Sequence, residues 1–342
     1  MPRCVPTPPC AGSEETWSRR RAPSSSVAAS TGLAAEENGA TFLIVYGFNR
    51  SLVRYWYRPD PFRSYLNAMR LVVRLLLSLR AVGSVLPVHM LLSGERQPGF
   101  EAELVSQFGV RLLSADEQDA QGQPRYWIRV PRFSSAFHWG SFVKLAVLGL
   151  VQFRRVIVLD TDAVVFRNID HLARAPAPSF VFRFKCWRGN ASRAPAIWEM
   201  NSGFMVLRPD EALHQRMLAL MNTMRMAPKD DVAVAALRNG PRGHDSRELQ
   251  RMFVPSDPGD QSVWRNFFGR VHELPVAYNA FKTTAFRNKS DWQRVYVLHD
   301  PDVNRRAVIP LPSAQRFYVN VTRSAQQLVT KMAAGLGVQD RG

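Results

Sequence analysis

The sequence predicts one α/β domain with a mostly parallel central sheet flanked by helices. Short apolar runs alternate with longer helical patterns between residues 41 and 325, which is the order that builds parallel, helix-covered sheets. Residues 156–159 are four consecutive apolar residues, as is typical of a central parallel strand. The chain has 342 residues, of which 46% are hydrophobic, and this suffices for a large core.

The first half of the domain is predicted to alternate strand and helix. Residues 41–47 form an apolar, β-branched run that ends in glycine, which favours a buried strand. Pro98 suits the first turn of a helix, and Gly83 and Gly109 follow helical patterns as stop signals. The expected elements are strand 41–47, helix 64–83, strand 85–94, helix 98–109 and strand 110–113.

The second half continues the alternation. The expected elements are a helix at 137–150, a strand within 154–166, a turn, strand and helix in 200–224, a turn and short amphipathic helix in 259–269, and a strand at 295–300. Beyond residue 325 the chain has a short helix-like stretch and a polar end. We therefore expect a disordered N-terminal tail at 1–40, a single domain at 41–325 and a C-terminal tail at 326–342.

The formal net charge is +17, and the excess belongs to the folded part because acids and bases balance within residues 1–40. Such a charge attracts nucleic acid, anionic membranes or phosphorylated small molecules. The basic residues are scattered and do not interleave with aromatic residues, so we expect no nucleic-acid partner. The alternative function is a non-catalytic basic protein for nucleic acid or anionic glycans, with affinity that falls steeply with salt.

The cysteines Cys4, Cys10 and Cys186 are too few for a disulfide framework and lack zinc-ligand spacing. No apolar stretch is long enough to encode a membrane span, and residues 1–40 lack the apolar run of a signal peptide. The compartment stays open between the secretory pathway or Golgi lumen and the cytoplasm, and the oligomeric state stays open between monomer and homodimer. N-glycosylation sequons, which favour the secretory pathway, begin at Asn49, Asn190, Asn288 and Asn320.

Asp160 and Asp162 directly follow the buried run 156–159. Central parallel strands bind ligands at their carboxyl ends. Carboxylate oxygens suit hard cations such as Mn²⁺ or Mg²⁺, and a bound cation helps a pyrophosphate to leave. The bare pattern is expected roughly once by chance, and a second copy starts at Asp300, but only the first follows an unbroken buried run. The structural alternative is a loop with capping aspartates.

His299 and Lys144 each allow two interpretations. His299 ends a strand, where it is either a packed side chain or a metal ligand whose nitrogen favours Mn²⁺ over Mg²⁺. Lys144 lies in an apolar helical pattern, where it either extends to solvent or contacts a phosphate as a point charge.

Two polar motifs are equally ambiguous on their own. Asn201-Ser202-Gly203 is either a turn into a strand or a group that holds sugar hydroxyls. Asp260-Gln261 is either a helix-capping pair or part of a site.

The order of these motifs resembles that of glycosyltransferase family 8, the retaining, glycogenin-like and galactosyltransferase-like enzymes. Their order and spacing together are specific and cover roughly residues 41–320. The matching motifs are Lys144, VIVLDTDAVVFRNIDHL (156–172), MNSGFMVLRP (200–209), GDQSVWRNFF (259–268), LPVAYNAF (274–281) and VYVLHD (295–300).

The resemblance implies a GT-A fold, a nucleotide-sugar donor that is usually a UDP-sugar, Mn²⁺, and retention of anomeric configuration. The implied metal ligands are Asp160, Asp162 and His299. The implied catalytic residues are Asp260, Gln261 and Asn201. The implied donor-binding residues are Tyr46, Tyr65, Lys144, Thr161, Ser202, Gly203 and Arg305, of which the first two line the nucleobase pocket.

The segment after His299 departs from the family pattern of an aromatic residue, Gly and then Lys-Pro-Trp. Here residues 300–306 read DPDVNRR, so Arg305 or Arg306 would replace the diphosphate-binding lysine with a charged fork. The acceptor stays unassigned, as does the route to retention, by same-face attack or through a covalent intermediate on Asp260. Self-glucosylation would need an accessible C-terminal tyrosine, and Tyr318 is the one near the end of the chain.

Overall fold

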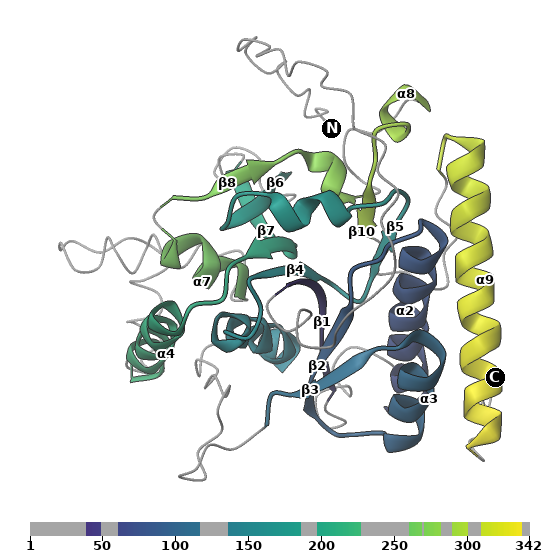
Figure 1. Cartoon of the computed structure of the whole chain (residues 1–342), viewed down its shortest axis with the longest axis horizontal. Coiled ribbons are helices and arrows are strands. Elements are labelled where there is room, and N and C mark those ends of the chain that lie inside the picture. The colour runs from purple at the N-terminus through teal and green to yellow at the C-terminus, as the bar shows by residue number, and fades with distance from the viewer. Residues whose placement is uncertain are drawn as a thin grey trace, which may run out of the picture.

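The computed structural model describes residues 39–48, 61–116, 136–185, 197–226, 260–268, 270–281, 289–299 and 309–336. A seven-stranded sheet forms the centre, with helices on both faces (Figure 1). The strands lie in the order β3-β2-β1-β4-β7-β6-β8. Their bounds are β1 Ala40–Phe48, β2 Val88–Gly94, β3 Arg111–Ser114, β4 Arg155–Leu159, β6 Ser179–Lys185, β7 Ile197–Leu207 and β8 His272–Leu274.

The sheet is mostly parallel, as predicted, with β7 reversed. β4 is its middle strand and pairs in parallel with β1 and antiparallel with β7. β1 also pairs in parallel with β2, and β2 with β3. Parallel neighbours need a crossover connection, and the helices α2 (Pro61–Ala81) and α3 (Pro98–Phe108) provide these two connections. The carboxyl ends of β1, β2, β3 and β4 therefore meet at one edge of the sheet.

Each face of the sheet buries its own apolar core. Ile157 and Leu159 point to one face, and Val156 and Val158 to the other, because successive strand residues alternate. The helices of the first face are α2 Pro61–Ala81, α3 Pro98–Phe108 and α9 Pro312–Gly335. The elements of the second face are the 3₁₀ helix η2 Ala136–Gly149, α4 Glu211–Met226 and α7 Asp260–Phe267.

A second sheet of three strands, in the order β5-β10-β9, lies beyond the end of β4. β10 pairs antiparallel with β5 and parallel with β9, so His299 lies opposite Ala163. This pairing carries His299 to the segment that follows Asp162. The elements of this region are β5 Ala163–Val165, β9 Ala280–Phe281, β10 Val297–His299, α8 Lys289–Trp292 and the 3₁₀ helices η3 Asp170–Arg174 and η4 Val276–Tyr278.

Several local expectations differ from the structure. The segment predicted as a helix at 137–150 is a 3₁₀ helix, buried from Leu145 to Leu148 between the sheet and α4. The segment 154–166 divides into two strands of different sheets, because the chain turns after Leu159. The expected boundary after residue 325 falls inside α9, which continues to Gly335.

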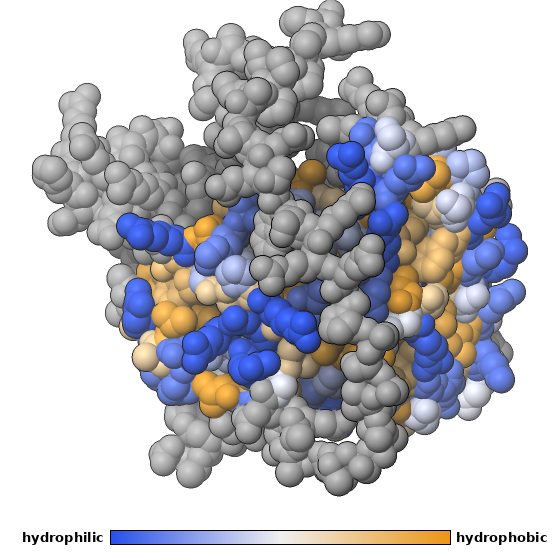
Figure 2. Space-filling model, turned by 45° about the horizontal axis from the view of Figure 1, so that its top comes forward, coloured by the Kyte–Doolittle hydropathy of each residue, from blue (hydrophilic) through white to orange (hydrophobic). Residues whose placement is uncertain are grey.

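The surface of the described part mixes both kinds of residue. Figure 2 shows hydrophilic and hydrophobic residues interspersed over the described part of one face. Within the described ranges, no helix combines the length and apolar character needed to cross a membrane.

Candidate active site

The turn after β4 carries two carboxylates to the edge of the sheet. Leu159 points to the face of the sheet that α2 covers. Because successive strand residues alternate, Asp160 points to the opposite face, which η2 covers. The turn is closed by the amide of Ala163, which donates to the carbonyl of Asp160 at 3.0 Å. The amide of Asp160 donates to the carbonyl of Gly203 on β7, also at 3.0 Å. Asp160 is therefore held by β4 on one side and β7 on the other.

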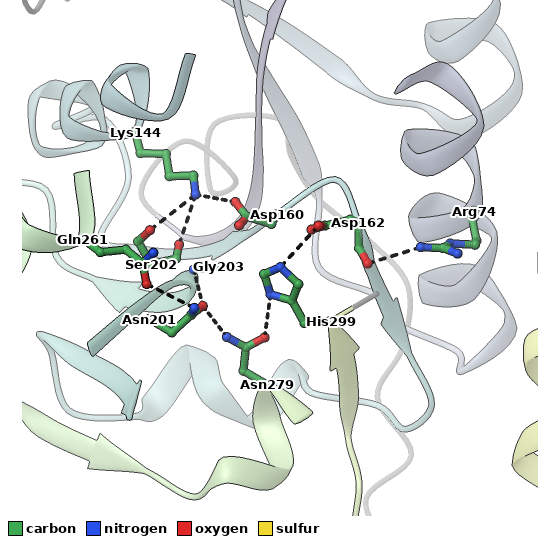
Figure 3. A network of polar contacts seen from close by, with 10 residues as sticks. All are labelled: Arg74, Lys144, Asp160, Asp162, Asn201, Ser202, Gly203, Gln261, Asn279 and His299. Atoms are coloured by element: carbon green, nitrogen blue, oxygen red, sulfur yellow. Dashed lines mark hydrogen bonds and ion pairs between the residues drawn. The ribbon is translucent and has the colours of Figure 1, made fainter. Parts of the chain in front are cut away.

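Lys144 of η2 reaches Asp160 across the second core. Its Nζ lies 2.5 Å from Asp160 Oδ1 and 3.5 Å from both the carbonyl and hydroxyl oxygens of Ser202 (Figure 3). Only 7% of Lys144 is exposed. Burial alone would lower the pKa of Lys144, but the carboxylates of Asp160 and Asp260 raise it above its ordinary value. Lys144 is therefore a permanent positive charge inside the site, and it does not extend to solvent.

Asp162 pairs with His299 of β10. His299 Nε2 lies 3.2 Å from Asp162 Oδ2. Although burial acts the other way on each group, this contact holds the pKa of Asp162 below its ordinary value and the pKa of His299 above it. In the metal-free protein the two side chains form an ion pair.

The residues Asp160, Asp162 and His299 fit a divalent cation. One ligand atom from each lies within 4.8 Å of the other two. Two carboxylates and one imidazole form a donor set that suits Mn²⁺. Lys144 contacts the Asp160 carboxylate and His299 contacts the Asp162 carboxylate, so both carboxylates already have a positively charged neighbour. A bound cation would add positive charge at the same place.

A chain of amides determines which nitrogen of His299 is free. The amide of Gly203 donates to Asn201 Oδ1 at 2.8 Å, which fixes the orientation of that amide group. Asn279 Nδ2 donates to the same oxygen at 2.6 Å, so Asn279 Oδ1 faces His299 Nδ1 at 3.2 Å. His299 must then carry its proton on Nδ1 when neutral, and its Nε2 lone pair faces Asp162. Such a partner on the far nitrogen is typical of metal-binding histidines.

Asn279 was not among the sequence-predicted site residues. It is 1% exposed and directly precedes β9, so it enters the site through the second sheet. The only signal in the sequence is its place in the motif 274–281. Its role depends on two partners that are 78 and 20 residues away in the chain.

The Asn201-Ser202-Gly203 motif lies inside β7, and the expectation of a turn is wrong. The pairing of β6 with β7 jumps from Phe180↔Met205 to Val181↔Asn201, so β7 is irregular at this motif. Such bulges redirect side chains beside active sites. At this irregularity Asn201 contacts both Gln261 and Asn279. Ser202 contacts Lys144, and Gly203 lies against His299.

Gly203 is required by the closeness of His299. A Cβ at this position would lie 2.6 Å from His299 Cε1 and 2.8 Å from Asn201 Oδ1. We expect Gly203→Ala to displace both side chains and to weaken Mn²⁺ binding roughly 10- to 100-fold, as losses in a metal's outer shell do. Titration of Mn²⁺ against the folded variant measures this.

Gly335→Ala is the matched control for that substitution. A Cβ at Gly335 meets no atom within 4 Å. This variant should bind Mn²⁺ like the wild type. Equal Mn²⁺ affinity in Gly203→Ala and Gly335→Ala would contradict the assigned role of Gly203.

Asp260 and Gln261 begin α7 next to β7. Asp260 is 3% exposed, and its Oδ2 has no hydrogen-bond partner among the described residues. Burial raises the pKa of Asp260 above its ordinary value, although Lys144 acts against this rise. Gln261 Oε1 accepts a hydrogen bond from Asn201 Nδ2 at 3.1 Å. The pair therefore belongs to the same cluster as Lys144 and the β7 motif.

A small hollow lies beside the end of β1. Tyr46 and Tyr65 line it, and their rings meet edge to face with centroids 6.5 Å apart. Ile44 pairs with Leu159 in the last pair of β1 with β4, so Tyr46 lies two residues further along β1, at the edge of the sheet where the carboxylate turn begins. The Tyr46 hydroxyl is buried without a hydrogen-bond partner among the described residues. Arg96 and Glu101 form an ion pair at the rim, with Nη2 and Oε2 2.7 Å apart.

The structure thus brings most sequence-predicted site residues together at the carboxyl edge of the sheet. Arg305, Arg306 and the second acidic pair, Asp300 and Asp302, lie outside the described residues.

Comparison with known proteins gives partial matches. No family model matches the chain. A segment of 86 residues, 25% of the chain, is 31% identical to inositol phosphorylceramide glucuronosyltransferase 1 of Arabidopsis thaliana. Another of 116 residues, 30% of the chain, is 23% identical to galactinol synthase 1 of Solanum lycopersicum. These matches cover 14% and 35% of the two curated proteins.

Among solved structures, the chain is similar to the apo form of the bifunctional glycosyltransferase WbbM. The TM-score is 0.52 at 12% identity, over 86% of this chain and 52% of the WbbM chain. This chain has the GT-A fold. The expectation of a single GT-A domain with a mostly parallel sheet is confirmed, and the site described above occupies the carboxyl edge of that sheet.

Proposed function

We propose that the chain is a metal-dependent retaining glycosyltransferase that moves a hexose from a nucleotide-sugar, in the first place a UDP-sugar. The observation that carries this proposal is the cluster of Asp160, Asp162 and His299 at the end of the middle strand, with Lys144 buried beside it. The partial matches to two glycosyl-transferring enzymes and the GT-A fold support the same reaction class.

The residues that would hold the cation are Asp160, Asp162 and His299, with Mn²⁺ favoured over Mg²⁺ by the imidazole nitrogen. The bound ion would neutralise the diphosphate of the donor and so make it a better leaving group. Asn279 keeps the Nε2 lone pair of His299 directed to this place.

Lys144 provides the fixed positive charge for the diphosphate. Its ammonium is held by Asp160 and by both oxygens of Ser202, so it needs no rearrangement when negative charge develops on the leaving oxygen. In the buried site this charge is worth more than at the surface because water does not screen it.

The hollow at Tyr46 and Tyr65 suits the nucleobase of the donor. Aromatic and apolar side chains, among them Tyr46, Tyr65 and Leu92, line it, and a planar base can pack against such a lining. The unpartnered hydroxyl of Tyr46 offers a hydrogen bond to such a ring. The hollow and the carboxylate turn lie at the same edge of the sheet, since Ile44 pairs with Leu159 and both β1 and β4 end there.

Asp260, Gln261 and Asn201 are the candidates beside the reacting sugar carbon. The open oxygen of Asp260 is a buried polar atom that needs a hydrogen-bond donor, which a sugar hydroxyl would provide. Asn201 orients Gln261 through its side-chain amide. Both routes to retention remain compatible with this arrangement. Tyr318 is 2% exposed, so it is not the accessible tyrosine that self-glucosylation would need.

The proposal is tested by hydrolysis of a panel of UDP-, GDP- and ADP-sugars with Mn²⁺ and with EDTA. We expect Mn²⁺-dependent release of a nucleoside diphosphate from at least one donor. Binding of UDP that needs Mn²⁺ would support the same site in a slow hydrolyser. If no donor is hydrolysed and UDP does not bind with Mn²⁺, while RNA or heparin binds with a steep salt dependence, the alternative of a basic binding protein replaces the enzyme.

A further inference from the structure

A buried arginine on α2 contacts the back of the carboxylate turn. Arg74 has 0% exposure, and its Nη2 donates to the main-chain carbonyl of Asp162 at 3.2 Å (Figure 3). Its Nη1 donates to the hydroxyl of Tyr318 at 3.3 Å, and its Cζ lies 5.6 Å from the centroid of that ring. The guanidinium thus joins α2, α9 and the turn, three segments that are far apart in the sequence.

Arg74 contacts the main chain of the turn and not the carboxylate oxygens that would bind a cation. It binds the carbonyl oxygen of Asp162, while the Asp162 carboxylate stays directed to His299. A contact with the carboxylate itself would compete with a cation, whereas a contact with the carbonyl only fixes the peptide plane. Because the peptide plane sets the direction of the Cα–Cβ bond, Arg74 aims the carboxylate without occupying it.

α2 holds the same segment at a second point. Ser78, one helical turn after Arg74 and also fully buried, accepts a hydrogen bond from the amide of Val165 at 3.0 Å. Residues four apart lie on one face of a helix. The two polar side chains of this face therefore hold Asp162 and β5, while β7 holds Asp160 through Gly203.

α9 completes the surroundings of Arg74. It packs along α2, as Figure 1 shows, and buries Tyr318, Ala325 and Val329. A buried guanidinium is stable only when hydrogen bonds compensate its lost hydration. Tyr318 provides one of these bonds and the ring face, so the orientation of Arg74 depends on the C-terminal helix.

We propose that Arg74 is a positioning residue for the cation site and that Tyr318 of α9 holds it in place. The C-terminal helix is then part of the cation site, although none of its residues is a ligand. This inference rests on the proposed function, because it assumes that Asp160, Asp162 and His299 bind a divalent cation.

The test compares three folded variants by Mn²⁺ titration, read from the electron paramagnetic resonance of free Mn²⁺. Arg74→Met keeps a flexible, unbranched stem and removes the charge and the hydrogen bonds to Asp162 and Tyr318. Tyr318→Phe removes only the hydroxyl. Val329→Ala is the control, because Val329 is buried on the same helix and packs in the first core without contacting Arg74 through a polar group. Thermal unfolding of each variant is measured alongside.

We expect the Mn²⁺ affinity to fall about 10-fold or more in Arg74→Met and by a smaller factor in Tyr318→Phe, the range seen when a metal's supporting shell is altered. Val329→Ala should lower the melting temperature and leave the Mn²⁺ affinity unchanged. A folded Arg74→Met variant with wild-type affinity would overturn the inference. If Arg74→Met does not fold, wild-type affinity in Tyr318→Phe overturns it instead.

Two further outcomes separate the possible failures. If Val329→Ala weakens Mn²⁺ binding as much as Tyr318→Phe does, the effect follows helix stability and the positioning role is wrong. If the wild-type protein binds no Mn²⁺, with or without UDP, the proposed function itself fails, whatever the variants do.

Discussion

Asp162→Asn is expected to abolish Mn²⁺-dependent UDP binding and to lower sugar transfer about 10³-fold, since a cation's charge stabilisation amounts to several kcal/mol. Asp162 is one of three residues whose ligand atoms lie within 4.8 Å of one another, and its carboxylate is the partner of His299. Asparagine keeps the shape but removes the negative charge that attracts the cation. Calorimetric titration with UDP, with and without Mn²⁺, and donor hydrolysis measure the two effects.

Asp170→Asn is the matched control. Asp170 begins the 3₁₀ helix η3, where it accepts hydrogen bonds from Ser84 and from the amide of Val85, away from the site. Its loss of charge should leave UDP binding unchanged. Metal-independent activity of wild-type size in Asp162→Asn would contradict the proposed enzyme.

Asp162→Asn should also change how the stability of the metal-free protein depends on pH. The pKa of Asp162 is lowered from 3.8 and that of His299 is raised from 6.5. The ion pair therefore stabilises the fold fully between these two values, less as pH falls through the lowered pKa of Asp162, and less as pH rises through the raised pKa of His299. Asp162→Asn should thus destabilise the metal-free protein more at pH 5.5 than at pH 9. Urea unfolding with EDTA at both pH values measures the difference, and equal losses would contradict the ion pair.

Lys144→Met is expected to lower both stability and activity. Methionine fills a similar volume, but it leaves Asp160 and Asp260 without the ammonium that compensates their burial. Removing one partner of a buried ion pair costs roughly 3–5 kcal/mol. Loss of a charge that faces the leaving group lowers transfer about 10²- to 10³-fold. Urea unfolding and donor hydrolysis measure the two losses separately.

A double variant tests the structural effect of Lys144 on stability. Lys144→Met with Asp260→Asn removes one uncompensated carboxylate, so part of the lost free energy of unfolding should return. Lys331→Met on the exposed side of α9 is the control for loss of a lysine and should change stability by less than about 0.5 kcal/mol. Wild-type stability and activity in Lys144→Met would show that its contact with Asp160 has no part in the site.

The strand and helix order was predictable because it depends on local patterns. The run at 156–159, the capping pattern from Pro98 to Gly109 and the long apolar face of 64–83 are properties of neighbouring residues. The structure has β4, α3 and α2 at these places. The direction of β7 was not predictable in this way, since an antiparallel strand beside β4 depends on the whole sheet.

Candidate site residues were predictable where they stand at an element's end or in a motif. Asp160 and Asp162 follow a buried strand, and the structure has them with His299 and Lys144 in one cluster. Asn279 and Arg74 were missed because their neighbours in sequence give no sign of their partners. Arg74 lies on a helix whose pattern is satisfied by its apolar residues, and its contacts are 88 and 244 residues away.

The sequence by itself determined the alternation of elements, the burial of the strand before Asp160 and the residues able to bind a cation. Only the tertiary structure decided that Asn201 and Asn279 orient His299, that the β7 motif is an irregular strand, and that α9 closes over Arg74. The physical reason is that periodicity tells which side of an element is buried, whereas hydrogen bonds and ion pairs depend on which elements meet. That choice is made by the packing of two cores against one sheet.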